Sequence, residues 1–514
     1  MLNSWARAGL RPVVAQRVED VYPNYEITRR QREILEALST HKQLMIRDLP
    51  GQGKSFLLAI WALASDRAMR DQEVRTTTTV LVHTMELAHQ YYEWIARLVG
   101  DTQLNVDEIV QQVTYGPASM EYLQNETLLK TPFPHILIAT PERLRLMLND
   151  ARFVDKFDSS SLHRIVVDEA DQMITFPENR KMSPSEELDI RTANTPLELL
   201  LQHLQHLRKP SSSEGLGAIW CSATLNSKFR LGLVLKGWGT ESNHLLKFVG
   251  AGRVGGNDFK RTTPEDISHH VMYVDGEQGV EDAKLPKVSL DQIVSTKELE
   301  RAKMNAPHII DDAATRSTWK TNASRTISNA YYNAITDIFK AEEGSIGRAL
   351  VLFASDTECT SAIDALRSLS YTTEHLHFPI PEASCKVLVS TVAGARGLNI
   401  PGLTHVFHIG PLAQTNDYVH CAGKLRRLGQ SEGPAKSFTL LCKQDNLAEM
   451  ALRLTKIGLH ASIFFTDKGE VVDDSGSSNL ALHKSKHVRV DDGADSGLQS
   501  HIEYENGVEN HAPG

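Results

Sequence analysis

With 514 residues the chain is too long for one hydrophobic core, so its length predicts two or three domains. A hydrophobic content of 41% and a charged content of 23% are typical of a soluble globular protein, and no apolar run reaches the ~18 residues that a membrane span needs. The five scattered cysteines include no C-x-x-C pair and indicate neither a disulfide framework nor a zinc site, and the net charge of -9 excludes nucleic-acid binding by bulk charge alone.

The N-terminal segment carries three arginines, Arg7, Arg11 and Arg17, ahead of its first acidic residue, Glu19. Organelle presequences share this arginine-rich and acid-poor composition. An amphipathic helix that leads into the first domain gives the same pattern. Both interpretations stay open at this point.

A strand, a glycine-containing turn and a helix are predicted next. A helical pattern over residues 32–38 precedes Gln43–Arg47, which has three consecutive apolar residues, and the apolar stretch Phe56–Leu63 follows without Pro or Gly. Between them lies the turn Asp48–Ser55. In such a turn, backbone N–H groups converge on phosphate oxygens, and the N-terminus of the following helix adds partial positive charge.

This turn has the residue types of a nucleoside triphosphate site. Lys54 would reach the outer phosphates and Ser55 would ligate Mg²⁺. The usual G-x-x-x-x-G-K-[ST] pattern has glycine where this chain has Asp48. The turn alone therefore leaves a phosphate cradle and an ordinary strand-to-helix turn both open. The predicted cradle residues are Gly51, Gln52, Gly53, Lys54 and Ser55.

Four apolar strands, each followed by polar residues, are predicted in the rest of the first half. They are Thr79–Val82, Ile136–Ala139, Arg164–Val167 and Ala218–Cys221. Helical stretches such as Pro196–Arg208 separate them, and this alternation predicts a parallel sheet. Since ligands bind at the carboxyl ends of such strands, the polar residues that follow them are expected to meet at one site.

Paired carboxylates follow the third of these strands. Asp168 can hold the Mg²⁺ that Ser55 also contacts, and Glu169 can orient or deprotonate an attacking water. A single Asp-Glu pair is more commonly a solvated turn. Four strand-end motifs in one order favour the catalytic interpretation.

These motifs carry a family resemblance: the chain resembles a DEAD-box RNA helicase. The tetrapeptide Asp168–Asp171 gives that family its name. Thr84–Gln90 resembles the P-T-R-E-L-A-x-Q motif, Thr140–Leu144 the T-P-G-R-L motif, and Ser222–Thr224 the S-A-T motif. The motifs fall in the family's order with plausible spacings.

The resemblance extends from about Trp5 to about Leu441. Gln31 lies where the adenine-reading Q motif belongs, and Trp5 lies about where an upstream aromatic residue stacks on the adenine in that family. Thr391–Asn399 resembles motif V and Tyr418–Arg427 resembles motif VI. In the family these later motifs belong to a second RecA-like domain that closes over ATP.

The resemblance implies an α/β fold of two RecA-like parallel-sheet domains, with ATP and Mg²⁺ in the cleft between them and RNA, single-stranded or a short duplex, across both. The implied catalytic residues are Lys54, Asp168, Glu169 and the arginine finger Arg427. The implied ATP contacts are Gln31, Gly51, Gln52, Gly53, Lys54, Ser55 and Lys424, with Ser55 and Asp168 on the metal. RNA contacts would come from Thr84, Thr140, Arg143 and Thr391, and coupling from Ser222, Thr224, Arg396 and His420.

Four segments follow from this layout. Residues 1–250 are predicted to form the first domain, 251–335 a linker and charged insertion, 336–466 the second domain, and 467–514 a disordered acidic tail. Strands are predicted at Arg348–Ala354 and Lys386–Ser390, and Ile267–Val274 is a further candidate strand of the second sheet. The insertion is expected to be solvated, and residues 275–330 are the alternative site for an RNP or protein partner.

Several positions depart from the family pattern, although the ATP-side residues of the first domain, Gly51, Gly53, Lys54, Ser55, Asp168 and Glu169, are all present. Met85 replaces an arginine that meets a phosphate, and Glu142 replaces a glycine whose backbone approaches the RNA. Too few residues separate Leu366 from Lys386 to hold the family's Q-x-x-R motif and its helix. In the second domain the departures are Cys421 and Lys424 in place of arginines, and Asn399 in place of an aspartate.

These departures leave alternatives to an ATP-dependent RNA helicase. A degenerate ATP-binding RNA clamp or assembly factor without unwinding activity is favoured by Cys421 and by the missing helix, and opposed by Glu169 and Arg427. A DNA-directed helicase is opposed by the full Asp-Glu-Ala-Asp string and by Gln31. The gap before Lys386 has a further explanation, an artefact of gene modelling or splicing.

We expect a monomer without membrane association, located inside the cell. The R-G-L-N sequence of motif V resembles that of some mitochondrial DEAD-box proteins, and the arginine-bearing start agrees. Mitochondrion and cytoplasm or nucleus both stay open.

Overall fold

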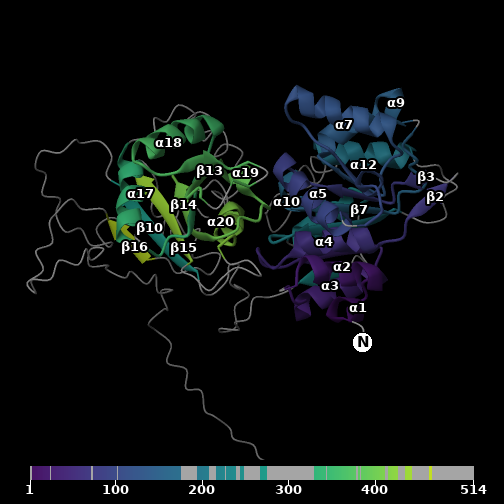
Figure 1. The fold of residues 1–514 in the computed structure, drawn as a ribbon, viewed down its shortest axis with the longest axis horizontal. Coiled ribbons are helices and arrows are strands. Elements are labelled where there is room, and N and C mark those ends of the chain that lie inside the picture. The colour runs from purple at the N-terminus through teal and green to yellow at the C-terminus, as the bar shows by residue number, and fades with distance from the viewer. Residues whose placement is uncertain are drawn as a thin grey trace, which may run out of the picture.

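The protein, seen in a computed structural model, consists of two α/β domains arranged side by side (Figure 1). Arg427, residues 275–328 and the tail from residue 466 lie outside the described residues, so the expectations for them stay predictions. The structure describes residues 3–23, 25–70, 73–100, 102–154, 156–174, 194–207, 216–225, 227–238, 244–247, 267–274, 329–342, 344–377, 380–381, 384–410, 415–425, 435–442 and 462–465.

The first domain is built on a seven-stranded parallel sheet with the order β5-β6-β4-β7-β8-β1-β9. This arrangement confirms the predicted parallel sheet, and the five strands predicted for it lie within one residue of the observed bounds. Two further strands of four residues each, β5 and β9, were not predicted. The strands are β1 (Gln43–Arg47), β4 (Thr78–Leu81), β5 (Val110–Val113), β6 (Ile136–Ala139), β7 (Arg164–Asp168), β8 (Gly217–Ser222) and β9 (His244–Lys247).

The second domain repeats this architecture in a seven-stranded parallel sheet ordered β12-β13-β11-β14-β15-β10-β16. The candidate strand at Ile267–Val274 is present as β10 and joins this sheet, so the predicted linker 251–335 contains an element of the second domain. The strands are β10 (Ser268–Val274), β11 (Arg348–Phe353), β12 (Thr373–His375), β13 (Val387–Thr391), β14 (Leu403–Ile409), β15 (Lys436–Cys442) and β16 (Ser462–Phe465).

Helices connect the strands of both sheets, as parallel pairing requires. In the first domain they are α1 (Ser4–Arg7), α2 (Pro12–Val21), α3 (Arg29–Thr40), α4 (Lys54–Ala64), α5 (Met85–Val99), α6 (Val106–Ile109), α7 (Ala118–Lys130), α8 (Pro141–Leu148), α9 (Ala151–Val154), α10 (Ala170–Met173), α12 (Pro196–Leu207) and α13 (Ser227–Leu235). In the second they are α17 (Asn329–Ala341), α18 (Asp356–Ser368), α19 (Val392–Ala395) and α20 (Thr415–Ala422). The hairpin β2 (Ala68–Arg70) and β3 (Glu73–Arg75) stands apart from both sheets.

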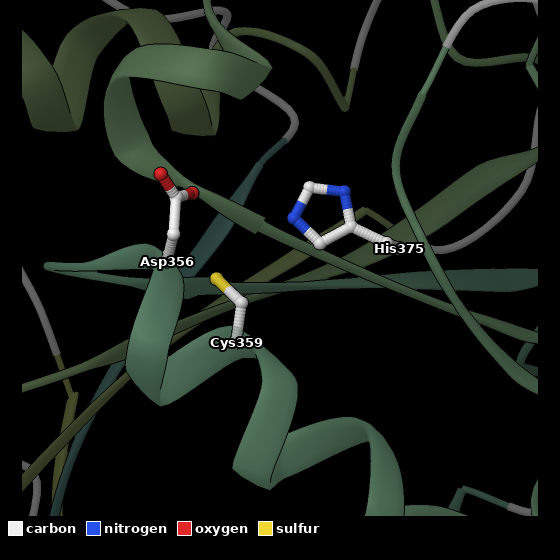
Figure 2. A group of neighbouring side chains, drawn as sticks. All are labelled: Asp356, Cys359 and His375. Atoms are coloured by element: carbon white, nitrogen blue, oxygen red, sulfur yellow. The ribbon is translucent and has the colours of Figure 1, made fainter.

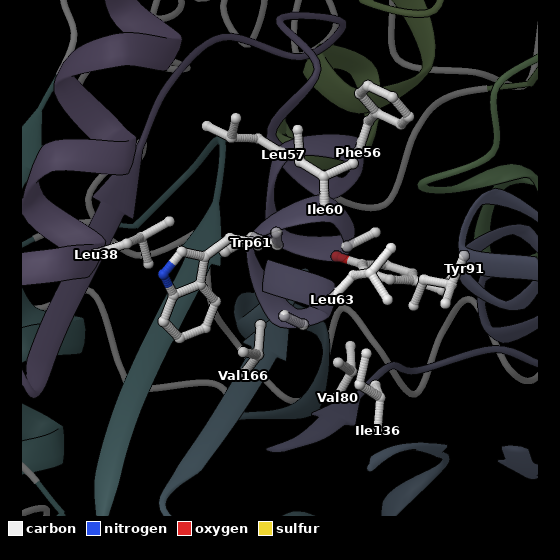
Figure 3. Close-up of a cluster of buried hydrophobic side chains, with 14 of the residues drawn as sticks. Leu38, Phe56, Leu57, Ile60, Trp61, Leu63, Val80, Tyr91, Ile136 and Val166 are labelled. Atoms are coloured by element: carbon white, nitrogen blue, oxygen red, sulfur yellow. The ribbon is translucent and has the colours of Figure 1, made fainter. Parts of the chain in front are cut away.

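Both faces of the first sheet are buried. Val166 packs in one hydrophobic cluster and its neighbour Val167 in another, because successive strand side chains point to opposite faces. Figure 3 shows the first cluster, in which Ile60 of α4 accompanies Val80 and Val166 of the sheet. Each such aliphatic side chain stabilises the domain by roughly 1.5–3 kcal/mol. This packing holds the start of α4, and with it the turn after β1, against the sheet.

The N-terminal segment is part of the first domain. Ala15 and Val18 of α2 are buried in the same cluster as α4, and Arg17 Nε donates to the Leu98 carbonyl at 3.0 Å. Residues 4–21 therefore form helices that lead into the domain, as the amphipathic-helix interpretation predicts. None of the helices in the described ranges combines the length and the apolar character of a membrane span.

Strand order brings the predicted motifs together. Arg47 at the end of β1 pairs with Ser222 of β8, and Asp168 at the end of β7 pairs with Cys221 of the same strand. The phosphate turn, the paired carboxylates and the Ser222–Thr224 motif therefore follow three adjacent strands. In the second sheet Phe353 of β11 pairs with Thr391 of β13.

Candidate functional site

The phosphate turn joins β1 to α4 through two glycines in left-handed conformation. Gly51 and Gly53 have φ angles of 79° and 75°, where a residue with a Cβ would cost roughly 1–2 kcal/mol. Gly53 is the N-cap and Lys54 the first residue of α4. The turn thus ends at a helix N-terminus, whose unpaired backbone N–H groups suit phosphate oxygens.

Lys54 is buried within this turn. Its ammonium donates to the backbone carbonyls of Asp48 at 2.9 Å and Leu49 at 2.7 Å. These bonds hold the ammonium group inside the loop. When a triphosphate enters, the same group can donate to phosphate oxygens instead. The contact of Lys54 with the outer phosphates stays a prediction.

Gln31 connects α3 to the same turn. Its side chain forms a capping box with Thr28, which fixes it at the start of α3. The free amide hydrogens then reach outward: Nε2 donates to the Tyr25 hydroxyl at 2.9 Å and to the Gln52 carbonyl at 3.3 Å. The residue predicted to read the base is thus hydrogen-bonded to the predicted phosphate cradle.

A cavity of about 230 Å³ lies between the two domains and is lined by both. The first domain contributes the phosphate turn, Glu169 and aromatic side chains, and the second contributes residues of motifs V and VI. The aromatic lining residues are Tyr22, Tyr25, Phe56 and Trp94, the turn residues are Pro50, Gly51, Gly53, Lys54 and Ser55, and the second-domain residues are Gly397, Asn399 and His420.

The aromatic side of this cavity differs from the prediction. Trp5, expected to stack on an adenine, is fully buried and stacks instead on Tyr25, with ring centroids 5.9 Å apart. Tyr25 borders the cavity and Trp5 does not. Trp5 is thus a packing residue behind the cavity wall, because it fills the core between α1 and the domain. The Tyr22–Tyr25 segment just before the Q motif was the sequence signal for this wall.

The predicted metal residues meet at a tyrosine hydroxyl. Tyr91 of α5 donates to Asp168 Oδ2 at 2.8 Å, and the same hydroxyl interacts with Ser55. Burial, and then the nearby Asp168 charge, raises the pKa of Tyr91, so the hydroxyl stays a donor. Ser55 and Asp168 therefore lie close enough to share a ligand, and a carboxylate with a hydroxyl is an oxygen donor set that fits Mg²⁺.

Glu169 has an unusual backbone. Its φ of 53° is left-handed, a conformation that costs a non-glycine residue roughly 1–3 kcal/mol and is found at functional sites. Its carboxylate borders the cavity, and Oε2 lies 3.2 Å from His420 Nδ1 and 3.5 Å from Arg396 Nε. The predicted catalytic carboxylate is thus held by two residues of the other domain.

Asp171 and Arg396 are the centre of a buried charge cluster that crosses the domain interface. The Asp171 carboxylate accepts from the hydroxyls of Ser222 and Thr224, and its Oδ2 lies 2.5 Å from Arg396 Nη2. Burial would raise the pKa of Asp171, but the Arg396 guanidinium holds it well below its usual range. Arg396 also lies 3.2 Å from Asp417. Three of the four predicted coupling residues, Ser222, Thr224 and Arg396, therefore contact the Asp171 carboxylate directly.

His420 is also in this cluster, 3.8 Å from Asp171 and 3.5 Å from the Thr224 hydroxyl. Burial, followed by the Arg396 charge, lowers the pKa of His420 to about 3. The imidazole is therefore neutral at physiological pH. It can donate one hydrogen bond to Glu169 without adding a second positive charge beside Arg396.

A second contact between the domains was missed by sequence reasoning. The Gln90 amide of α5 accepts from the Asn399 backbone N–H at 2.5 Å and donates to the Gly397 carbonyl at 3.3 Å. One side chain thus holds both backbone groups of motif V. Lys424 is buried, and its ammonium donates to the Leu398 carbonyl at 3.2 Å. It does not border the cavity, so the structure does not bring it to the predicted phosphate site.

The predicted RNA residues lie at the N-termini of helices that follow strands. Thr84 and Thr391 accept hydrogen bonds from the first turns of α5 and α19, and Thr140 is the N-cap of α8. Arg143 is different, because its guanidinium donates to Asn125 at 2.9 Å and lies 3.6 Å from Glu121. The structure thus pairs the one cation of this set with groups of α7.

The unexpected residue of the phosphate turn, Asp48, has a charge partner. Its side chain is 2% exposed, and Oδ1 lies 2.9 Å from Arg30 Nη1. Burial raises the pKa of Asp48, against the Lys54 and Arg30 charges that lower it. Since Arg30 precedes Gln31, the first turn of α3 contacts the phosphate turn through a charge pair and an amide. A carboxylate in a phosphate cradle would repel ATP, so its neutralisation favours binding.

Replacing Arg30 by alanine is expected to weaken ATP binding about tenfold, because it leaves the Asp48 carboxylate without this partner beside the phosphates. Asp48→Ala is expected to bind ATP at least as tightly as the wild type. The double variant is expected to recover wild-type affinity. Titration with a fluorescent ATP analogue measures all three dissociation constants. Arg29→Ala is the matched control, since Arg29 pairs with Glu33 on the exposed face of α3. Additive effects of the two single changes would contradict the coupling.

Two helicase family models match successive parts of the sequence. The model described as DEAD/DEAH box helicase matches residues 28–230, and the one described as helicase conserved C-terminal domain matches residues 372–429. Among curated relatives, the mitochondrial translation ATP-dependent RNA helicase mrh5 of Schizosaccharomyces pombe is 24% identical over 447 residues, which cover 78% of this chain and 72% of that protein.

The fold is similar to that of solved helicases. One is the DEAD-box helicase Mss116 bound to ssRNA and UDP-BeF, with a TM-score of 0.61, 17% identity, and coverage of 91% of this chain and 81% of that one. Another is S. cerevisiae Dbp5 bound to RNA and ADP BeF3, with a TM-score of 0.59, 14% identity, and coverage of 90% and 96%. At these identities the likeness establishes the two-domain fold.

Proposed function

The chain belongs to the DEAD-box family of superfamily 2 helicases, and from this premise we propose that it hydrolyses ATP between its two domains to remodel or unwind RNA or RNP. The observation that carries the proposal is the cavity lined jointly by Lys54, Glu169 and His420. A site completed only when two domains meet can link the state of the nucleotide to the arrangement of the domains.

The residues of the first domain would bind and activate the nucleotide. Gln31 would read the base, the Gly51–Gly53 backbone would bind phosphates, and Lys54 would neutralise their charge. Ser55 and Asp168 would hold Mg²⁺, which when bound neutralises charge on the outer phosphates. Glu169 would orient the attacking water and accept its proton. The contacts from His420 and Arg396 support this role by fixing the carboxylate.

The Asp171 cluster would couple the domains. Ser222 and Thr224 bind one carboxylate that Arg396 also binds from the second domain. Separation of the domains would expose Arg396 and Asp171 to water. Closure would therefore replace the water around these charged groups with the ion pair, and opening would reverse this. Arg427, which lies outside the described residues, and Lys424, which does not border the cavity, keep their predicted roles as proposals.

RNA is the proposed second substrate. The relative mrh5 is named an RNA helicase, and the solved structures of Dbp5 and Mss116 contain RNA. The helix N-termini at Thr84, Thr140 and Thr391 offer backbone N–H groups to a phosphate backbone. A monomer, and a protein or RNP partner at residues 275–330, stay predictions. An intracellular location is our expectation, and the name of mrh5 supports the mitochondrion among the compartments.

The test of the function is ATP hydrolysis by the full chain with and without single-stranded RNA. The proposal predicts turnover that RNA stimulates. ATP binding without turnover, unchanged by RNA, would favour the alternative of a nucleotide-gated RNA clamp. Stimulation by single-stranded DNA alone would favour a DNA-directed enzyme.

Restoring the family arginine at Met85 and removing the negative charge of Glu142 are together expected to strengthen RNA binding. The Glu142 charge lies beside Arg143 and Tyr115, where it opposes phosphate. Met85→Arg combined with Glu142→Gln is expected to raise single-stranded RNA affinity about tenfold at low salt and to steepen the slope of log K against log salt by about 0.7 for the added contact. Fluorescence anisotropy over a salt series measures both. Glu36→Gln on the exposed face of α3 is the control, and an unchanged slope in the double variant would contradict the predicted RNA path.

A further inference from the structure

Three metal-ligating side chains meet in the second domain, away from the nucleotide cavity. Asp356 is the first residue of α18, Cys359 follows one turn later, and His375 is the last residue of β12. One donor atom from each lies within 4.8 Å of the other two. Figure 2 shows the carboxylate, the sulfur and the imidazole directed toward one another. The i, i+3 spacing on α18 places the first two on one face of the helix.

The histidine is oriented as a ligand. Its Nδ1 lies 3.1 Å from the Leu376 carbonyl, which can only accept, so in the neutral ring Nδ1 carries the hydrogen and Nε2 has the lone pair. Metal-binding histidines usually have such a backbone carbonyl partner on the other nitrogen. In Figure 2 the ring nitrogen far from the backbone faces Asp356 and Cys359. The Nε2 atom of His375 therefore faces the Cys359 thiol and the Asp356 carboxylate.

The donor set selects a class of metal. Sulfur and imidazole nitrogen suit Zn²⁺ and its neighbours among the divalent transition metals, whereas Mg²⁺ and Ca²⁺ require oxygen ligands. We propose that Asp356, Cys359 and His375 bind a divalent transition metal ion of the Zn²⁺ class, with the fourth coordination position open to water or an added ligand.

The surroundings give the site a structural role. β12 has three residues and lies at the edge of its sheet, paired to β13 alone. The described residues between β12 and β13 include no helix, although parallel crossovers usually have one to cover the strand. A metal bound to His375 and to α18 would tie this edge strand to the neighbouring helix. The tie lies beside β13, whose last residue is Thr391 of the proposed RNA path.

Metal binding competes with a proton at the thiol. Burial, and then the charges of Asp356 and Glu358, raises the pKa of Cys359 to about 12, so the thiol is protonated without metal and is deprotonated on binding. A second cluster, Glu169, Asp171 and His420, also has donors within 4.8 Å of one another. There Arg396 already supplies the positive charge between the carboxylates, so that cluster needs no ion.

The test titrates the chelator-treated full chain with Co²⁺ and records its absorption. The wild type is expected to bind one equivalent with a thiolate-to-cobalt charge-transfer band, and Zn²⁺ is expected to displace the Co²⁺. Cys359→Ser is expected to lose the band. His375→Ala and Asp356→Asn, which change exposed side chains, are expected to weaken binding at least about tenfold. Zn²⁺ is expected to raise the Tm of the wild type and not that of His375→Ala.

Two variants are matched controls. His377→Ala removes an exposed histidine two residues from His375, and Cys385→Ser changes another buried cysteine of the same domain. Both are expected to keep the band and the Co²⁺ affinity. A wild type without the band, or an unchanged band in Cys359→Ser, would overturn the site, and so would equal Co²⁺ affinity in His375→Ala. None of these readouts depends on ATP hydrolysis.

Discussion

Replacing Glu169 by glutamine is expected to lower RNA-stimulated ATP hydrolysis by about 10²- to 10⁴-fold, because the amide cannot accept the proton of the attacking water. Glutamine keeps the length of the side chain, and Lys54, Ser55 and Gln31 are untouched. ATP affinity is therefore expected to stay close to that of the wild type. Steady-state turnover with saturating RNA measures the first effect, and titration with a fluorescent ATP analogue measures the second.

The control for this change is Glu36→Gln, which alters an exposed carboxylate of α3. Equal turnover in Glu169→Gln and the wild type would remove Glu169 from the chemistry. Equal loss of turnover and of ATP affinity would instead indicate that Glu169 shapes the site through its left-handed backbone. The split between kcat and ATP affinity therefore separates a catalytic from a structural effect.

Replacing Arg396 by alanine is expected to lower turnover by about 10²- to 10³-fold through a different physical cause. Removing one partner of a buried ion pair costs roughly 3–5 kcal/mol, since the remaining charges lose both water and partner. Arg396 lies against Glu169 and Asp171 of the first domain. With the domains apart, both carboxylates regain water. The lost free energy is thus expected to destabilise the closed arrangement of the two domains. The distance between fluorescent labels on the two domains measures closure.

Two comparisons separate closure from stability. Arg396→Lys keeps the charge but loses the planar guanidinium, so intermediate turnover is expected. Arg348 is also buried, but it donates to the Pro381 and Cys385 carbonyls within the second domain. Arg348→Ala is therefore expected to lower the Tm of that domain more than Arg396→Ala, which removes from the domain its ion pair with the partly exposed Asp417. Wild-type turnover and closure in Arg396→Ala would contradict the coupling role of the Asp171 cluster.

The strands and the phosphate turn are predictable from the sequence because their signals are local. Runs such as Ile136–Ala139 are apolar at every position, which only a strand buried on both faces explains at that length. The glycine spacing of the turn, and the carboxylates after β7, then place the site at one sheet edge. The strands β5 and β12 give no comparable signal, because β5 (VQQV) has two glutamines at its centre and β12 (TEH) has no apolar residue.

Residues whose role depends on packing are not predictable in this way. An aromatic residue upstream of the Q motif can stack on a base or fill the core, and sequence position alone assigned the first role to Trp5. The structure gives it the second, because Tyr25 lies between it and the cavity. The pairing of Gln90 with Asn399 joins positions 309 residues apart, which no local pattern reports. The cluster at Cys359 is equally hidden, since its ligands come from a helix and an edge strand without a C-x-x-C pair.

The pairing of Arg30 with Asp48 limits the order in which this sequence can change over generations. A lineage that acquired Asp48 first would carry a buried carboxylate in its phosphate turn that lacks the Arg30 partner, whereas one that acquired Arg30 first would carry only a partly exposed cation. The order in which Arg30 appears before Asp48 is therefore the less destabilising one. Relatives that retain an acidic residue at position 48 are expected to retain a basic residue at position 30, and those with glycine or alanine at 48 are expected to vary freely at 30.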